Sequence, residues 1–123
     1  MPNNFSTERQ DYDNLFTDAT VKPTTGTEIL AKGNKLMRGA VLGYVTTTNR
    51  VTIVNKAAVD SSKNVYCVLA EDTDATDGDK QVPVYYSGGF NVRNLIFGGT
   101  DTYVDHKLDA RMVQIFFNNV MKG

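Results

Sequence analysis

The sequence predicts a mainly β protein with one short helix near its C-terminus, preceded by an extended N-terminal arm. Three observations carry this prediction. From residue 29 onward, β-branched and aromatic runs alternate with short turn sequences rich in Gly, Asn, Asp and Thr. A helical spacing of apolar residues is convincing only after Gly98-Gly99. The first 28 residues hold few aliphatic side chains and many polar ones.

Bulk properties exclude several classes of protein. A chain of 123 residues is expected to form one domain with a modest core. Its net charge of −1 offers no field to attract nucleic acid or an anionic membrane. No apolar run approaches the ~18 residues of a membrane span, and the first residues lack the pattern of a signal peptide. The single cysteine, Cys67, fits synthesis in a reducing cytoplasm.

Residues 1–28 are predicted to form the arm, and residues 29–123 the β-rich body. The arm carries Pro2 and Pro23 and is too polar to bury enough of its own surface to offset its ordering entropy. We interpret it as a segment that becomes ordered against a partner. A terminus without a role is the alternative.

The body begins with a predicted β-hairpin. Residues 40–46 and 50–55 are β-branched runs on either side of the polar turn sequence Thr-Thr-Asn. Residues 64–70 form a near-continuous apolar strand, which we expect to be covered on both faces. Residues 80–86 resume strand character. Because Pro83 lacks an N–H group, that strand is expected to lie at an edge or to carry a bulge.

An acidic segment lies between these last two strands. It contains five carboxylates around Gly78, namely Glu71, Asp72, Asp74, Asp77 and Asp79. A calcium loop of the EF-hand type needs oxygen ligands at positions one, three and five, glycine at six and Glu at twelve. A frame that starts at Asp72 ends at Pro83, and a frame that puts Gly78 at six starts with Thr73 and Ala75. We therefore interpret the segment as a solvated turn and expect no metal.

One helix follows Gly98-Gly99. Thr102 and Asp105 resemble a capping box, with Asp in place of the usual Glu. The apolar residues that follow are spaced by four, four and three positions and form one stripe: Val104, Leu108, Met112 and Ile115. The sequence Ile-Phe-Phe at residues 115–117 fits either a last helical turn or a short closing strand.

Candidates for catalysis are few. His106, the only histidine, is expected among solvated helix residues. A Cys67–His106 pair is conceivable, but Cys67 stands in an apolar run where a small buried thiol is the ordinary interpretation. Zinc has too few soft ligands, and Ser-Gly-Gly-Phe-Asn at residues 87–91 lacks the lysine of a P-loop. We expect no enzyme, no cofactor and no small-molecule substrate.

Three segments occur in a recognisable order: Leu-Met-Arg-Gly-Ala-Val-Leu-Gly-Tyr-Val at residues 36–45, Val-Leu-Ala-Glu-Asp-Thr-Asp-Ala-Thr at 68–76, and Val-Pro-Val-Tyr-Tyr-Ser-Gly-Gly-Phe-Asn at 82–91. Together they resemble the lambda-type phage head decoration proteins. Residues 12–23 are similar to an Asp-Asn-Leu segment of that family. The predicted helix followed by Ile-Phe-Phe is similar to the C-terminal helix and closing segment of the family. Two positions depart from the family, since Gln114 and Cys67 stand where relatives usually carry glycine.

The resemblance implies a fold and a role. The family fold is a β-clip-like body that assembles as a homotrimer on the outside of the mature capsid, at positions of local threefold symmetry. It acts as a late, cementing protein that stabilises the head against internal DNA pressure. Its arm orders against the major capsid protein. A small phage tail or baseplate protein is the nearest alternative, and a binding module or small β-clip enzyme a more distant one.

Two sets of residues are expected to make the contacts. The arm would bind the capsid through Tyr12, Asn14, Leu15, Phe16 and Val21. Apolar side chains that a small core cannot hide would form the trimer or capsid interface, and the candidates are Tyr85, Tyr86, Phe90, Phe97, Phe116 and Phe117.

Overall fold

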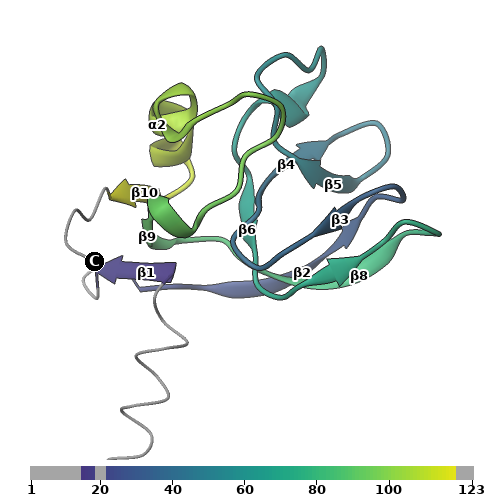
Figure 1. Cartoon of the computed structure of the whole chain (residues 1–123), viewed down its shortest axis with the longest axis horizontal. Helices are drawn as coiled ribbons and strands as arrows, with labels where there is room; N and C mark the ends of the chain where they lie inside the picture. The colour runs from purple at the N-terminus through teal and green to yellow at the C-terminus, as the bar shows by residue number, and fades with distance from the viewer. Residues whose placement is uncertain (1–14, 19–21, 119–123) are drawn as a thin grey trace, which may run out of the picture.

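The computed structural model describes residues 15–18 and 22–118. Over these residues the protein is mainly β with one short α-helix near the C-terminus, α2 (Tyr103–Met112), as the sequence predicts (Figure 1). None of the helices in this part of the chain has the length and apolar character to cross a membrane.

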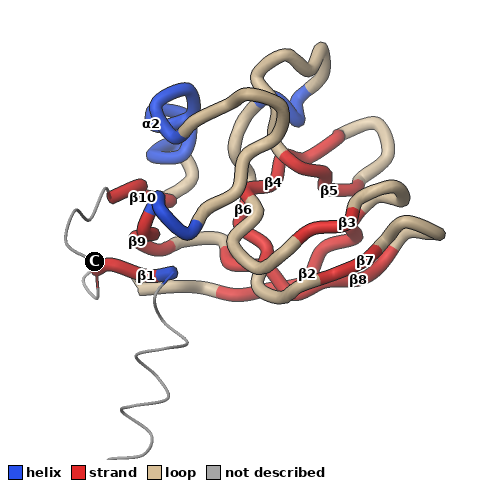
Figure 2. The backbone as a smooth tube through the Cα atoms, viewed as in Figure 1, coloured by secondary structure: helices blue, strands red, loops and turns tan. Residues whose placement is uncertain are grey.

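Five strands close into a barrel in the order β2-β5-β4-β6-β8 (Figure 2). They are β2 (Thr25–Leu30), β4 (Val41–Val45), β5 (Arg50–Ile53), β6 (Cys67–Leu69) and β8 (Lys80–Tyr85). The predicted hairpin is confirmed, because β4 and β5 pair antiparallel with Val45 opposite Arg50. Asn49 turns the chain with φ of 59°, a left-handed conformation that asparagine tolerates better than most residues.

Strand β6 separates two apolar cores, which confirms that it is covered on both faces. Its residues Cys67 and Leu69 belong to the core inside the barrel, whereas Val68 belongs to a second core outside it. The barrel core consists of Leu30, Ala40, Leu42, Val51, Cys67, Leu69, Ala75, Val82 and Val84. Alternation of side chains along a strand explains why neighbours on β6 face different cores.

The second core lies against a three-stranded sheet in the order β1-β9-β10. Strand β9 (Gly88–Asn91) pairs antiparallel with β1 (Phe16–Asp18) and parallel with β10 (Ile115–Asn118). Residues 115–117 therefore form a closing strand and not a last helical turn. This core consists of Leu15, Val41, Val54, Val65, Val68, Tyr85, Phe90, Ala110 and Ile115.

The predicted boundary between arm and body needs correction. It falls after residue 28, inside β2, so residues 25–28 belong to the barrel. Leu15 is only 2% exposed in the second core, and β1 pairs with β9, so residues 15–18 also belong to the body. Residues 1–14 and 19–21 of the predicted arm lie outside the described residues. The β-clip-like description of the body stays an expectation from the resemblance.

Pro83 is not in an edge strand, because β8 lies between β6 and β2. Its carbonyl accepts a hydrogen bond from the Ala70 N–H at 3.0 Å, on the side of β6. The N–H and C=O of one residue point to the same side in an antiparallel ladder. A residue with an N–H group at position 83 would therefore face the carbonyl of Ala70, one residue past the end of β6 at Leu69. The proline removes only this one hydrogen bond, at the end of the β6–β8 ladder.

Two short strands and two 3₁₀ turns complete the body. Strand β3 (Lys35–Leu36) pairs antiparallel with β7 (Thr73–Asp74). The 3₁₀ turns are η2 (Ser61–Lys63) and η3 (Val92–Asn94). Turn η2 packs directly on β4, where a Cβ atom at Gly43 would come within 2.3 Å of the Ser62 carbonyl oxygen. Any larger residue at position 43 would push η2 away from the barrel.

The start of α2 is as predicted. The Thr102 N–H donates to Asp105 Oδ2 at 2.8 Å, which is one half of a capping box. Of the four residues of the predicted apolar stripe, Val104, Leu108 and Met112 are 65%, 73% and 83% exposed and face away from the core. The fourth, Ile115, lies beyond the helix in β10 and is fully buried in the second core. The buried residues of the helix are His106 and Ala110.

Candidate functional site

The acidic segment consists of turns on either side of the short strand β7, and its carboxylates fasten it. Asp72 accepts a hydrogen bond from the Arg38 N–H at 2.8 Å, and Asp74 accepts one from the Thr76 N–H at 3.0 Å. Asp79 accepts from Arg50 Nε at 2.5 Å and from the Lys32 N–H at 2.8 Å. These bonds support the interpretation as turns outside β7, but the segment is not wholly solvated, because Ala75 is fully buried in the barrel core. Among the described residues no three His, Cys, Asp or Glu side chains are grouped to hold a metal ion.

The Asp79 carboxylate also ties the acidic segment to the barrel. Two hydrogen bonds lower the pKa of Asp79. The one from the Arg50 side chain has the larger effect, and the one from the Lys32 backbone has the smaller. The Arg50–Asp79 ion pair is partly exposed on both sides, so its contribution to stability is small. The segment is therefore built to hold its shape in water.

His106 lies in the protein interior and not among solvated residues, so that prediction is wrong. It is 1% exposed, and its ring is parallel to that of Phe97 at 5.8 Å between centroids. Its Nε2 lies 2.6 Å from Asp101 Oδ2 and its Nδ1 lies 3.2 Å from Asp109 Oδ2. Each carboxylate also accepts a backbone N–H from the barrel side, Asp101 from Lys56 and Asp109 from Val65.

This buried cluster explains why α2 turns its polar side inward. His106 connects the helix to the loop that precedes it, and the two carboxylates connect both to the segment after β5. Buried polar groups are costly unless they are hydrogen-bonded, and here both ring nitrogens have partners. Ala110 leaves room for close packing on the same side.

Cys67 is an ordinary core residue. It is fully buried in the barrel core, and burial raises the pKa of its thiol well above the usual value. A thiol in this state is a poor nucleophile. Both nitrogens of His106 already face carboxylates, so the histidine is not available as a base for Cys67.

The residues predicted to bind the capsid separate into two groups. Leu15 and Phe16 contact their own chain, with the Phe16 ring 4.9 Å from that of Tyr85 and 5.0 Å from that of Phe90. Leu15 is 2% exposed in the second core, which leaves it little surface for a partner. Phe16 packs against that core but is partly exposed, so its role in capsid binding stays a prediction. Tyr12, Asn14 and Val21 lie outside the described residues.

The six apolar interface candidates also separate. Phe90 is fully buried and Tyr85 is 6% exposed, because Phe16 covers both, so these two are core residues. Tyr86, Phe97, Phe116 and Phe117 are partly exposed, and their role in an interface stays a prediction. The Tyr86 hydroxyl bonds Glu28. Burial has the largest effect on the pKa of Tyr86 and this hydrogen bond the next largest, and both raise it well above its usual value.

A surface that the sequence did not reveal lies on α2. The side chains of Val104, Leu108 and Met112, called the α2 stripe below, are exposed and stand on one helix face. Next to it is a hollow lined by Leu108, Asp109, Arg111, Met112 and Phe116. The spacing was visible in the sequence, but period alone does not tell whether a stripe faces the core or a partner.

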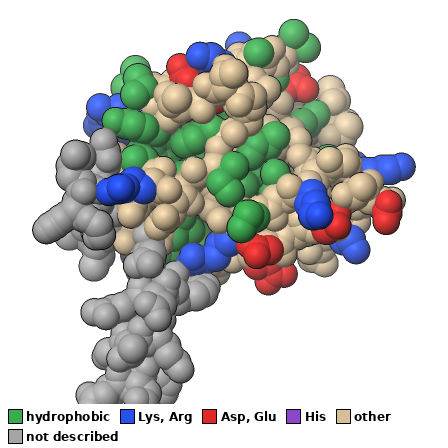
Figure 3. Space-filling model, in the orientation of Figure 1, with side chains coloured by type: hydrophobic (Ala, Val, Ile, Leu, Met, Phe, Trp, Pro, Cys, Tyr) green, Lys and Arg blue, Asp and Glu red, His purple; other side chains and the backbone are tan. Residues whose placement is uncertain are grey.

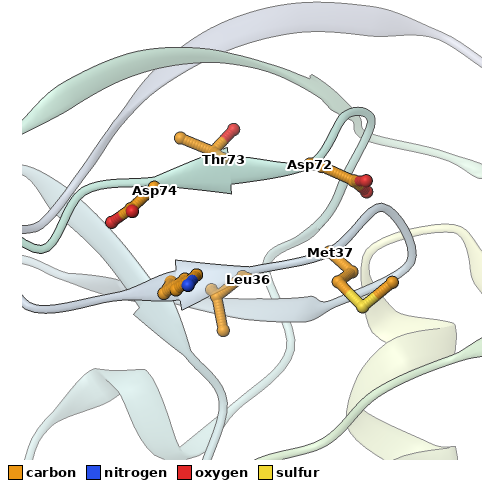
Figure 4. Close-up of a pocket in the computed structure, with 6 residues that line it drawn as sticks. Leu36, Met37, Asp72, Thr73 and Asp74 are labelled. Atoms are coloured by element: carbon orange, nitrogen blue, oxygen red, sulfur yellow. The ribbon is translucent and has the colours of Figure 1, made fainter.

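A second hollow lies between the short strands. The β3–β7 groove is lined by Lys35, Leu36, Met37, Asp72, Thr73 and Asp74. Met37 is 61% exposed, and its side chain lies at the same end of the groove as that of Asp72 (Figure 4). Figure 3 shows hydrophobic side chains in a band across this face, from the side of α2 toward that of β3.

The family model described as bacteriophage lambda head decoration protein D matches residues 4–113. The match includes the five strands of the barrel, strands β1 and β9 of the three-stranded sheet, and α2; β10 lies beyond it. No curated protein matches this chain.

Proposed function

Because the chain belongs to the family of bacteriophage lambda head decoration protein D, we propose that it forms a homotrimer on the outer surface of the mature phage head. The trimer binds the major capsid protein at positions of local threefold symmetry and stabilises the head against internal DNA pressure. It is a structural component of the virion and not an enzyme. The observation that carries this proposal is the family match over residues 4–113.

Physical features of the chain support each part. A trimer that bridges several capsid subunits binds through many contacts at once, so contacts that are weak singly become tight together. A net charge of −1 suits a protein on the outside of the head, where it does not meet the packaged DNA. The partly exposed Tyr86, Phe97, Phe116 and Phe117 are the proposed trimer or capsid contacts.

The capsid anchor is assigned to residues 1–14, with Tyr12 and Asn14, and to Val21. The first described residue, Leu15, is buried in the body, and β1, which follows it, is an outer strand of its sheet. Main-chain pairing with a capsid strand requires little side-chain specificity, which suits this Asn- and Thr-containing sequence. Ordering costs about 1–2 kcal/mol per residue, which contacts to the capsid must offset.

The test uses phage heads that lack a decoration protein. Full-length protein should sediment with the heads and raise the temperature at which they rupture, because it binds the intact lattice and not the broken one. A variant that lacks residues 1–14 should melt at the temperature of the full chain but fail to bind. A chain in which residues 1–14 are scrambled is the control for length and composition.

Two results would contradict the proposal. If the shortened variant decorates heads as well as the full chain does, the anchor lies elsewhere. If the full chain sediments with purified tails and not with heads, the protein is a tail or baseplate component instead.

A further inference from the structure

The α2 stripe has the character of a contact surface. Its three side chains are 65%, 73% and 83% exposed, and they follow one another at intervals of four residues on one helix face. Contiguous exposed apolar side chains on a soluble domain commonly mark an interaction site. The opposite side of the helix carries His106, which is buried and bonded to Asp101 and Asp109. Because that side faces the interior, the apolar stripe faces outward.

The stripe has a cationic border. Lys107 and Arg111 follow Val104 and Leu108 by three residues, so they flank the stripe on one side. Neither forms an ion pair within the part of the chain that the structure describes. The carboxylates of α2, Asp105 and Asp109, already bond within the chain. A partner of this face should therefore be apolar with an acidic edge.

The β3–β7 groove has that chemistry. It offers Met37 at 61% exposure and the partly buried Leu36, with the carboxylates of Asp72 and Asp74 beside them. Asp72 accepts a hydrogen bond from the Arg38 N–H but forms no ion pair with a described residue. Lys35 is the single cation that lines the groove, against two carboxylates.

We propose that the α2 stripe of one copy of this chain docks in the β3–β7 groove of the next copy. The apolar side chains meet, and Lys107 and Arg111 lie over Asp72 and Asp74. Two α2 stripes packed antiparallel about a twofold axis would instead set one cationic border beside the other. A stripe-to-groove contact joins two different surfaces, so it repeats from copy to copy until a ring closes. Only the number of copies, three, rests on the proposed function.

The sharpest test is complementation between two variants. Leu108→Asp spoils the stripe and leaves the groove intact, whereas Met37→Asp spoils the groove and leaves the stripe intact. Sedimentation equilibrium should find each variant monomeric, with association at least about tenfold weaker than in the wild-type chain. Mixed together they should form a 1:1 dimer and nothing larger, because one intact stripe meets one intact groove.

The matched control is Val59→Asp, since Val59 is a fully exposed apolar residue at 102% and lies outside both surfaces. It should assemble like the wild-type chain. Circular dichroism and the melting temperature establish that each variant is folded. As an independent arm, the double variant Lys107→Glu/Arg111→Glu should lose assembly, and adding Asp72→Lys/Asp74→Lys should restore it.

Several outcomes overturn the inference. A folded Leu108→Asp variant that assembles as the wild type does would show that the stripe is not the contact. Self-association of Met37→Asp with no complex on mixing would show that stripes pair with each other. A wild-type chain that is monomeric at every soluble concentration would also refute it. A Leu108→Asp variant that assembles normally but no longer binds heads would assign the stripe to the capsid, and would leave the proposed function intact.

Discussion

Leu15→Ala tests whether the start of the described chain belongs to the body. Leu15 is 2% exposed in the second core, and its Cδ1 lies 3.5 Å from where a Cβ of Gly39 would stand. Truncation of a fully buried leucine removes its transfer free energy and leaves a cavity, at a cost of about 2–5 kcal/mol. The neighbouring Phe16 packs edge-on against Tyr85, which limits how far the site can collapse.

The expected effect is large for a chain of this size. A loss of about 3 kcal/mol should lower the melting temperature by roughly 10 °C. Thermal unfolding followed by circular dichroism measures it, and Val59→Ala is the control because Val59 is fully exposed. If Leu15→Ala melts within a degree or two of the wild type, residues 15–18 do not belong to the body.

Three further predictions concern stability. Gln114 has φ of 70°, so Gln114→Gly should raise the free energy of unfolding by about 0.5–1 kcal/mol, measured by urea denaturation, and an unchanged or lower value would contradict the strain. His106→Ala leaves the carboxylate of Asp101, 2% exposed, without its closest side-chain partner and should cost about 3 kcal/mol; a neutral effect would show that the cluster does not hold α2. Burial, then a hydrogen bond to a carboxylate, raises the pKa of Tyr66 from 10.0 to about 12 and that of Tyr86 further. The stability from both hydroxyls is therefore full below pH 10 and is lost as the pH rises through about 12. Ultraviolet titration should show late ionisation of Tyr66 and Tyr86, and ionisation of both near pH 10 would refute this.

Features with local causes were predictable from the sequence. The hairpin of β4 and β5 follows from two β-branched runs and a turn with Asn49, which the structure places in the left-handed region. The helix start follows from Thr102 and Asp105, whose bond spans three residues. The resemblance leads us to expect glycine at position 114, and the positive φ of 70° at Gln114 gives that expectation a local reason.

Features set by distant contacts were not predictable in this way. The stripe of α2 has the same period whether it faces a core or a partner, and the orientation is decided by His106 and two carboxylates from different turns. Leu15 and Phe16 look like arm residues because their sequence surroundings are polar. Their partners, Tyr85 and Phe90, lie about seventy residues further along the chain.

Pro83 shows a third limit. Proline is disfavoured in an inner strand because it lacks a donor, and the sequence cannot reveal that Pro83 stands opposite Ala70, just past the end of β6 at Leu69. At the end of a ladder the proline removes a single hydrogen bond. Its cost therefore depends on where it stands along the neighbouring strand, and not only on whether its own strand is an edge.

The central claim is that this chain decorates the outside of a phage head as a trimer. An electron cryo-microscopy reconstruction of undecorated heads incubated with the purified chain tests it most directly. The account predicts added density on the outer surface at each local threefold position, with room for three copies of the barrel and its helix. Heads that gain no outer density, or density at a different symmetry position with a single copy, would contradict it.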